Sequence, residues 1–107
     1  MSYRKYRNVP HCVDNVTFQS KREASRYLEL LLLLHAGEIR DLELQPRYNI
    51  VVNGVRCGFY KADFRYIDRD GRSHTEDAKS PATRTTTYKL KKKLVEALYP
   101  GVRIEEV

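Results

Sequence analysis

Apolar residues recur at three- and four-residue spacing between Ser20 and Gly37, a pattern typical of a helix with one buried face. Ser20 is a favourable N-cap, Glu23 three residues later completes a capping box, and Gly37 is a suitable stop. The sequence therefore predicts a helix that ends near residue 36. Its expected buried stripe is Ala24, Tyr27, Leu28, Leu31 and Leu34 or His35. Leu30, Leu32 and Leu33 widen the stripe, which indicates packing on two sides or a subunit interface.

A second helical pattern runs from Thr85 or Thr86 to Leu98 and ends before Pro100-Gly101. Leu90, Leu94 and Leu98 recur at four-residue spacing and are expected to be buried. Lys92 pairs with Glu96 across one turn, whereas the neighbouring lysines have no such acid. This helix and the loop before it are therefore expected to contact DNA through Arg84, Lys89, Lys91, Lys92 and Lys93.

Extended segments connect and follow these helices. Alternating apolar residues over 42–52 predict strand structure that bends at Pro46. Asn53-Gly54 predicts a type I′ hairpin turn. A short strand or hairpin over 13–18, with Asp14-Asn15 as the turn, and a last edge strand over 103–107 complete the expected elements.

The run from Lys61 to Lys79 predicts two strands joined by a tight turn. Asp68-Arg69-Asp70-Gly71 suits a type I turn with glycine in the left-handed position, a loop that is followed by a bulge. This loop pairs Asp68 with Arg72, and therefore Asp63 with Asp77. A shorter Asp70-Gly71 loop would instead turn Asp77 to the wrong face.

The resulting pair of acids requires a positive partner. Two carboxylates directly opposite each other destabilise a sheet unless a lysine or a metal ion lies between them. Lys79 shares a strand face with Asp77, whereas Glu76 and Ala78 are expected to point away. Lys79 and Mg²⁺ are the two candidates, and a salt-bridged, solvated hairpin is the alternative interpretation.

Composition narrows the class of protein. The 107 residues suit one domain, and 20 Lys and Arg against 14 Asp and Glu give a net charge of +6, which favours a polyanionic partner. Residues 1–10 form a basic and aromatic arm that either follows a nucleic-acid backbone through Arg4, Lys5 and Arg7 or is a frayed terminus. Two scattered cysteines, no amino-terminal apolar run and no apolar run long enough for a bilayer indicate a cytoplasmic protein with reduced thiols.

Several ordered motifs together resemble the PD-(D/E)XK nuclease superfamily, and the chain is most similar to small phage proteins of a family of unknown function. The matching segments are Phe18-x-Ser20-Lys21-x-Glu23-Ala24, Leu44-Gln45-Pro46, Ala62-Asp63-Phe64-x-Tyr66, Glu76-Asp77-x-Lys79 and Lys89-Leu90-Lys91-Lys92-Lys93. Ala62 replaces the proline that usually precedes the first acid. The resemblance implies a mixed α/β, restriction-endonuclease-like domain, with one mostly antiparallel sheet packed by two main helices.

The resemblance also implies a site. Mg²⁺, for which Mn²⁺ substitutes, would be held by Asp63, Asp77 and the Ala78 carbonyl, while Lys79 would orient the attacking water. Glu23 is either a further metal ligand or only a cap residue. Gln45 either binds a metal-bound water or the scissile phosphate, or is a polar residue exposed at a bend.

The implied activity is Mg²⁺-dependent hydrolysis of DNA by an endonuclease similar to phage endonuclease I and Holliday-junction resolvases. Paired incision of branched DNA would require a homodimer, for which the leucine-rich first helix offers an interface. A non-catalytic DNA-binding or assembly module and a nuclease for other DNA or RNA substrates are the alternatives.

Overall fold

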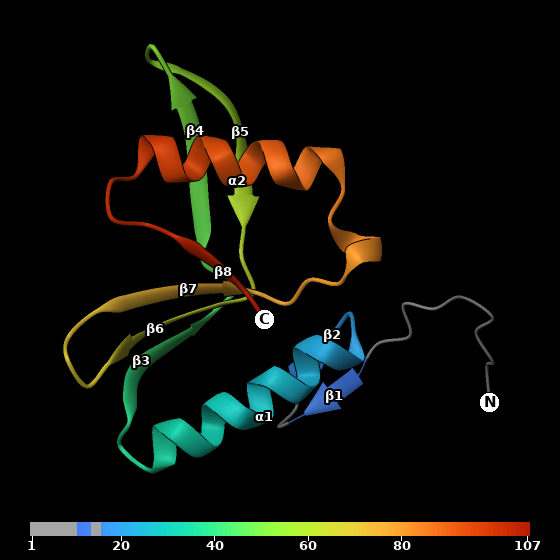
Figure 1. The fold of residues 1–107 in the computed structure, drawn as a ribbon, viewed down its shortest axis with the longest axis vertical. Helices are drawn as coiled ribbons and strands as arrows, with labels where there is room; N and C mark the ends of the chain where they lie inside the picture. Colours follow the sequence, from blue (N-terminus) through green and yellow to red (C-terminus); the bar gives the residue numbers. More distant parts are fainter. Residues whose placement is uncertain (1–10, 14–15) are drawn as a thin grey trace.

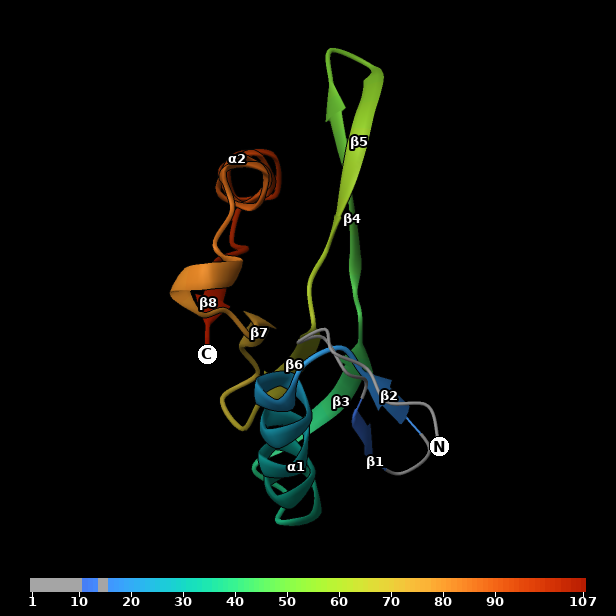
Figure 2. The same ribbon diagram turned by 90° about the vertical axis from the view of Figure 1, so that its right-hand side faces the viewer.

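A computed structural model describes residues 11–13 and 16–107 of the chain, so the predicted contacts of Arg4, Lys5 and Arg7 lie outside the described residues. A four-stranded sheet separates the two main helices (Figures 1 and 2). Its order is β3 (Ile39–Leu44), β6 (Phe64–Asp68), β7 (Ser73–Asp77) and β8 (Ile104–Glu106). The predicted edge strand β8 runs parallel to β7, and the other neighbours are antiparallel. These elements confirm the predicted mixed α/β class.

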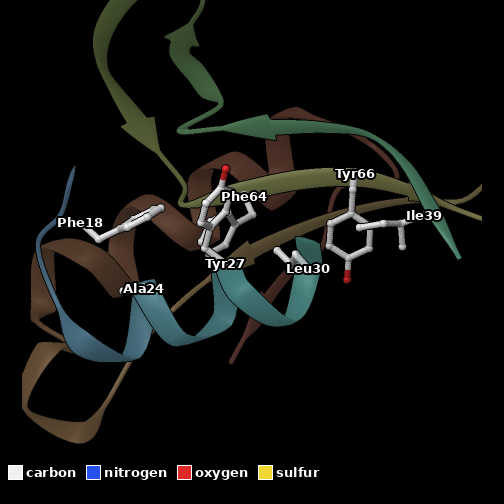
Figure 3. Close-up of a cluster of buried hydrophobic side chains, with 7 residues drawn as sticks. All are labelled: Phe18, Ala24, Tyr27, Leu30, Ile39, Phe64 and Tyr66. Atoms are coloured by element: carbon white, nitrogen blue, oxygen red, sulfur yellow. The ribbon is translucent and has the colours of Figure 1, made fainter. Parts of the chain in front are cut away.

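The first helix, α1 (Lys21–His35), packs on one side of this sheet beside the hairpin of β1 (His11–Val13) and β2 (Val16–Phe18). Figure 3 shows the side chains between them, which are Phe18, Ala24, Tyr27, Leu30, Ile39, Phe64 and Tyr66. Leu30 is fully buried, whereas Leu28 is 49% exposed and Leu32 is 72% exposed. The expected burial of Leu28 was therefore wrong, because the sheet covers the helix along the narrower line of Ala24, Tyr27 and Leu30.

A second hairpin, β4 (Arg47–Val52) and β5 (Val55–Lys61), forms its own two-stranded ladder and extends away from the sheet (Figure 2). Asn53 and Gly54 have φ angles of 51° and 77°, as the predicted type I′ turn requires. The hairpin continues into β3 and β6 through a bend at which Gln45 N donates to Asp63 O at 2.9 Å and Ala62 N donates to Pro46 O at 3.0 Å. The bend predicted at Pro46 is thus confirmed.

The second helix, α2 (Thr86–Leu98), packs against the β4–β5 hairpin and is capped by Thr85. Its buried residues are Tyr88 and Val95, while Leu90 is 57% exposed and Leu98 is 37% exposed. The bounds of this helix were predicted well. Leu94 packs against the core as expected, but the expected burial of Leu90 and Leu98 was wrong. Aromatic packing decides the rotation, because the core on this side consists of Tyr48, Ile50, Tyr60, Ala62, Tyr88, Val95 and Ile104.

The turn between β6 and β7 has the predicted form. Gly71 has a φ of 84°, and its N–H donates to Asp68 O at 3.0 Å. Asp68 N donates to Arg72 O at 2.9 Å, and Phe64 pairs with Glu76 at the other end of the ladder. This register confirms that Asp63 lies opposite Asp77. No helix in the described part of the chain is long and apolar enough to cross a membrane.

Candidate active site

A cleft of about 640 Å³ opens beside the bend, where the start of α1 meets the segment that follows β7. Four lining residues are sequence-predicted catalytic residues that come from distant parts of the chain: Glu23, Gln45, Asp63 and Lys79. Ala78, the predicted carbonyl ligand, also lines the cleft. The other lining residues are Gln19, Ser20, Lys61, Ala62, Ser80, Ala82 and Thr83. The last two belong to a short 3-10 turn, Pro81–Thr83, whose backbone is closed by Ser80.

Asp63 lies in the break between β5 and β6, and it is partly buried. One carboxylate oxygen accepts a hydrogen bond from Ala78 N at 2.7 Å, which ties the first acid to the Asp77-Ala78-Lys79 segment. Burial raises the pKa of Asp63, and the hydrogen bond with Asp77 and the charge of Asp77 raise it further. Both effects arise because the two acids lie close together in a partly buried site.

Asp77 is only 2% exposed, and it is held by two donors. Lys79 Nζ lies 3.3 Å from one carboxylate oxygen, and the hydroxyl of Tyr60 donates to the other. The same ammonium lies 4.5 Å from the centroid of the Tyr88 ring, so an aromatic face also positions Lys79. As predicted, Asp77 and Lys79 act on the same side of the sheet.

Glu23 has a structural role through its backbone and a different environment for its side chain. Its N–H donates to Ser20 Oγ at 3.1 Å, which confirms the predicted N-cap. Burial raises the pKa of the Glu23 carboxyl, and the charge of Asp77 raises it further, while Gln19, Lys79 and Asp63 oppose the rise. The carboxylate therefore belongs electrostatically to the same group as Asp63 and Asp77.

Gln45 occupies the bend opposite Asp63 and has a φ of 54°, a left-handed conformation that is uncommon for a residue with a side chain. Such backbone strain persists where the surrounding structure imposes it and is frequent at functional sites. Its side chain is exposed, as the alternative interpretation expected, but it lines the cleft.

Glu76 lies on the face of β7 opposite Asp77, as strand alternation predicted, but it is buried there and not exposed to solvent. It is 1% exposed and faces α1, where Arg26 donates to its two oxygens at 2.8 and 2.6 Å and Tyr66 donates a further bond. Both faces of this sheet are covered, so neither acid of the Glu76-Asp77 pair is at the surface. Glu76 holds α1 on the sheet, and Asp77 remains the acid of the cleft.

The oxygen atoms around the cleft are of the chemical type that binds a hard divalent cation. Carboxylate and carbonyl oxygens are the ligands that Mg²⁺ takes, and Glu23, Asp63 and Ala78 line one cleft beside Asp77. Within residues 16–107, no three Asp, Glu, His or Cys side chains are already arranged as metal ligands. Protein donors instead engage the acids, through Ala78 N, Tyr60 and Lys79.

The predicted DNA-contacting residues after the cleft have mixed environments. Lys89 and Lys93 are exposed, and Lys92 forms the predicted pair with Glu96 at 3.2 Å. Arg84 is paired with Glu106 at 3.0 Å. Lys91 lies 5.5 Å from the centroid of the Phe59 ring. In the described chain these side chains belong to the α2 layer and do not line the cleft.

Sequence reasoning missed two contributors to the site. Lys61 lines the cleft, and its place on the same strand face as Asp63 was a signal that could have identified it. Strand alternation places Tyr60 on the face opposite Asp63, and no sequence signal indicated its bond to Asp77. The bend makes this contact possible, because it places Tyr60 and Ala62 in the core beside α2 and Phe64 and Tyr66 in the core beside α1.

The fold and the cleft define a mixed α/β protein with a partly buried acid–lysine site. The chain belongs to the family described as "Protein of unknown function (DUF1064)", whose model matches residues 3–107. No curated protein and no solved structure matches the chain.

Proposed function

We propose that this protein is a metal-dependent DNA endonuclease of the PD-(D/E)XK type that hydrolyses phosphodiester bonds. The observation that carries the proposal is the cleft, which brings Asp63 and the Asp77-Ala78-Lys79 segment together with Glu23. A salt-bridged surface hairpin, the alternative interpretation, would leave these acids solvated. Asp77 is instead 2% exposed.

The charges of the cleft favour a divalent cation. Glu23, Asp63 and Asp77 carry three negative charges when ionised, against two cations: Lys79, which pairs with Asp77 at 3.3 Å, and the exposed Lys61, which also lines the cleft. Burial raises the pKa of Glu23 and of Asp63, and the neighbouring Asp77 raises both further. A divalent cation would replace the missing positive charge, and perturbed acids in a cleft are typical of catalytic sites.

The residues divide the chemistry between them. Asp63, Asp77 and the Ala78 carbonyl would hold Mg²⁺ or Mn²⁺, with Glu23 as a further ligand, and the ion would supply an activated water and charge stabilisation at the phosphate. Lys79, fixed between Asp77 and the Tyr88 ring, orients the water and neutralises the phosphate. Gln45 binds a second oxygen of the scissile phosphate from the opposite side of the bend.

The proposed substrate is branched DNA such as a Holliday junction, in phage recombination or replication in the host cytoplasm. A net charge of +6 supports binding to DNA through phosphate contacts, which carry no sequence information. Symmetric incision requires two sites, and the exposed Leu28 and Leu32 on α1 offer a surface for a second copy of the chain.

The test compares cleavage of labelled four-way junction, matched duplex, single-stranded DNA and RNA, in Mg²⁺ and in EDTA. We expect metal-dependent paired nicks in the junction. Lys79→Ala should abolish cleavage and retain DNA binding. Equal cleavage of all four substrates would leave a general nuclease. Tight binding with no cleavage of any substrate would favour the non-catalytic DNA-binding module.

A further inference from the structure

The outer face of the β4–β5 hairpin carries a cluster of cations around one exposed aromatic ring. Arg47 Cζ lies 3.7 Å from the centroid of the Phe59 ring, Lys91 Nζ lies 5.5 Å from it, and Arg56 Cζ lies 6.0 Å from it. Lys61 is directly opposite Arg47 in the ladder and is also exposed. We call Arg47, Arg56, Phe59, Lys61 and Lys91 the hairpin platform.

The charges of the platform are not balanced by acids of the described chain. Like charges directly opposite each other destabilise a β-ladder, and Arg47 and Lys61 are such a pair. None of the four cations of the platform forms an ion pair with an acid of the described chain. By contrast, five other arginines of the chain are each paired with an acid: Arg26, Arg40, Arg65, Arg69 and Arg84. The platform therefore has cations available for an external anion.

The platform is continuous with the cleft. Lys61 belongs to both, since it lines the cleft with Asp63 and pairs with Arg47 at the base of the hairpin. Phe59 precedes Lys61 by two residues in β5, so strand alternation places the two side chains on the same face. Arg47 and Lys61 thus lie at the base of the hairpin next to the acids, and Arg56 lies further out, beyond a bulge in the ladder.

We infer that the hairpin platform binds the phosphate backbone of the DNA strand whose scissile phosphate lies in the cleft. This inference rests on the proposed nuclease function and names the path that the substrate takes. The Phe59 ring holds the Arg47 guanidinium by its face, which leaves the N–H edge free to donate to phosphate oxygens. Lys61 and Arg56 supply further phosphate contacts on either side, and Lys91 joins them from α2.

The experiment measures the Kd of a labelled four-way junction by fluorescence anisotropy in EDTA, at several salt concentrations, so that cleavage is not needed. Each phosphate contact contributes about 0.9 to the slope of the logarithm of the binding constant against the logarithm of the salt concentration. Near 0.15 M salt, this corresponds to about a fivefold gain in affinity per contact. Arg47→Gln should therefore weaken binding about fivefold. The Arg47→Gln/Lys61→Gln pair should weaken it about 30-fold and lower the slope by about 1.8.

Two further variants separate the platform from a general charge effect. Arg72→Gln removes an exposed arginine from the turn between β6 and β7. It should change the affinity for DNA only slightly, by the effect of one unit of net charge. Phe59→Leu keeps every cation and removes the ring, so it should weaken binding about two- to fivefold with an unchanged slope. Circular dichroism and thermal unfolding check that each variant is folded.

The outcomes distinguish this inference from the proposed function. Unchanged affinity and slope in the Arg47→Gln/Lys61→Gln variant would overturn the platform, even if the wild type cleaves DNA. The expected losses in a protein that never cleaves DNA would support the platform and overturn the nuclease. An equal loss in Arg72→Gln would overturn the platform by showing that any surface arginine contributes the same.

Discussion

Asp63→Asn should stabilise the metal-free protein although it removes a residue of the proposed active site. Burial and the neighbouring Asp77 raise the pKa of Asp63 to about 8, so near pH 7 the folded protein holds a proton that the unfolded chain releases. For each pH unit above the ordinary pKa of aspartate, the free energy of unfolding falls by about 1.4 kcal/mol, which amounts to about 4 kcal/mol at pH 7. The buried amide that replaces the acid retains part of the desolvation cost, so we expect a gain of about 2 to 4 kcal/mol.

The sign follows from the direction of the shift. A raised pKa makes the wild type lose stability as the pH rises from about 4 to about 8, and the Asp63→Asn variant should lack this dependence. Urea unfolding in EDTA measures both effects, with the exposed Asp70→Asn as the matched control. Addition of Mg²⁺ should then stabilise the wild type and the control, but not Asp63→Asn. A variant less stable than the wild type in EDTA would refute the reasoning.

Three further predictions concern residues around the cleft. Arg26→Met leaves the buried Glu76 without its cation and should cost about 3 to 5 kcal/mol in urea unfolding, whereas a surface pair would cost under about 1 kcal/mol. His74 is bonded to two acids that raise its pKa, so His74→Gln should destabilise the protein more at about pH 5.5 than at about pH 8.5, and equal losses would contradict this. Tyr60→Phe removes a donor to Asp77 and should lower the cleavage rate about 10- to 100-fold with nearly unchanged DNA affinity, and a full rate would exclude a positioning role.

Local signals in the sequence predicted the hairpin of β6 and β7 well. The turn from Asp68 to Gly71 determines its register, because a glycine in the left-handed position and the carboxylate of Asp68 define one loop length. Once that loop is known, strand pairing places Asp63 opposite Asp77 without reference to the rest of the fold. The cap at Ser20 and the bend at Pro46 have equally local causes.

The failed predictions concern contacts between distant elements. Helical spacing in α2 favoured Leu90, but the aromatic residues of the hairpin select the face with Tyr88 and Val95. Alternation could not show that both faces of β7 are covered, and therefore missed the burial of Glu76. Both outcomes depend on which helices and strands pack against one another in the folded protein. No single segment of the sequence determines this packing.

The most direct test of the proposed active site is the Mg²⁺ dependence of four-way junction cleavage by the wild type and Asp77→Asn, with Asp70→Asn purified identically as the control. We expect the wild type and the control to cleave with the same saturable dependence on Mg²⁺. Asp77→Asn should bind the junction without cutting it, because it lacks a proposed metal ligand and the acid that positions Lys79. Cleavage by Asp77→Asn at the wild-type rate, or cleavage by the wild type in EDTA, would contradict the account.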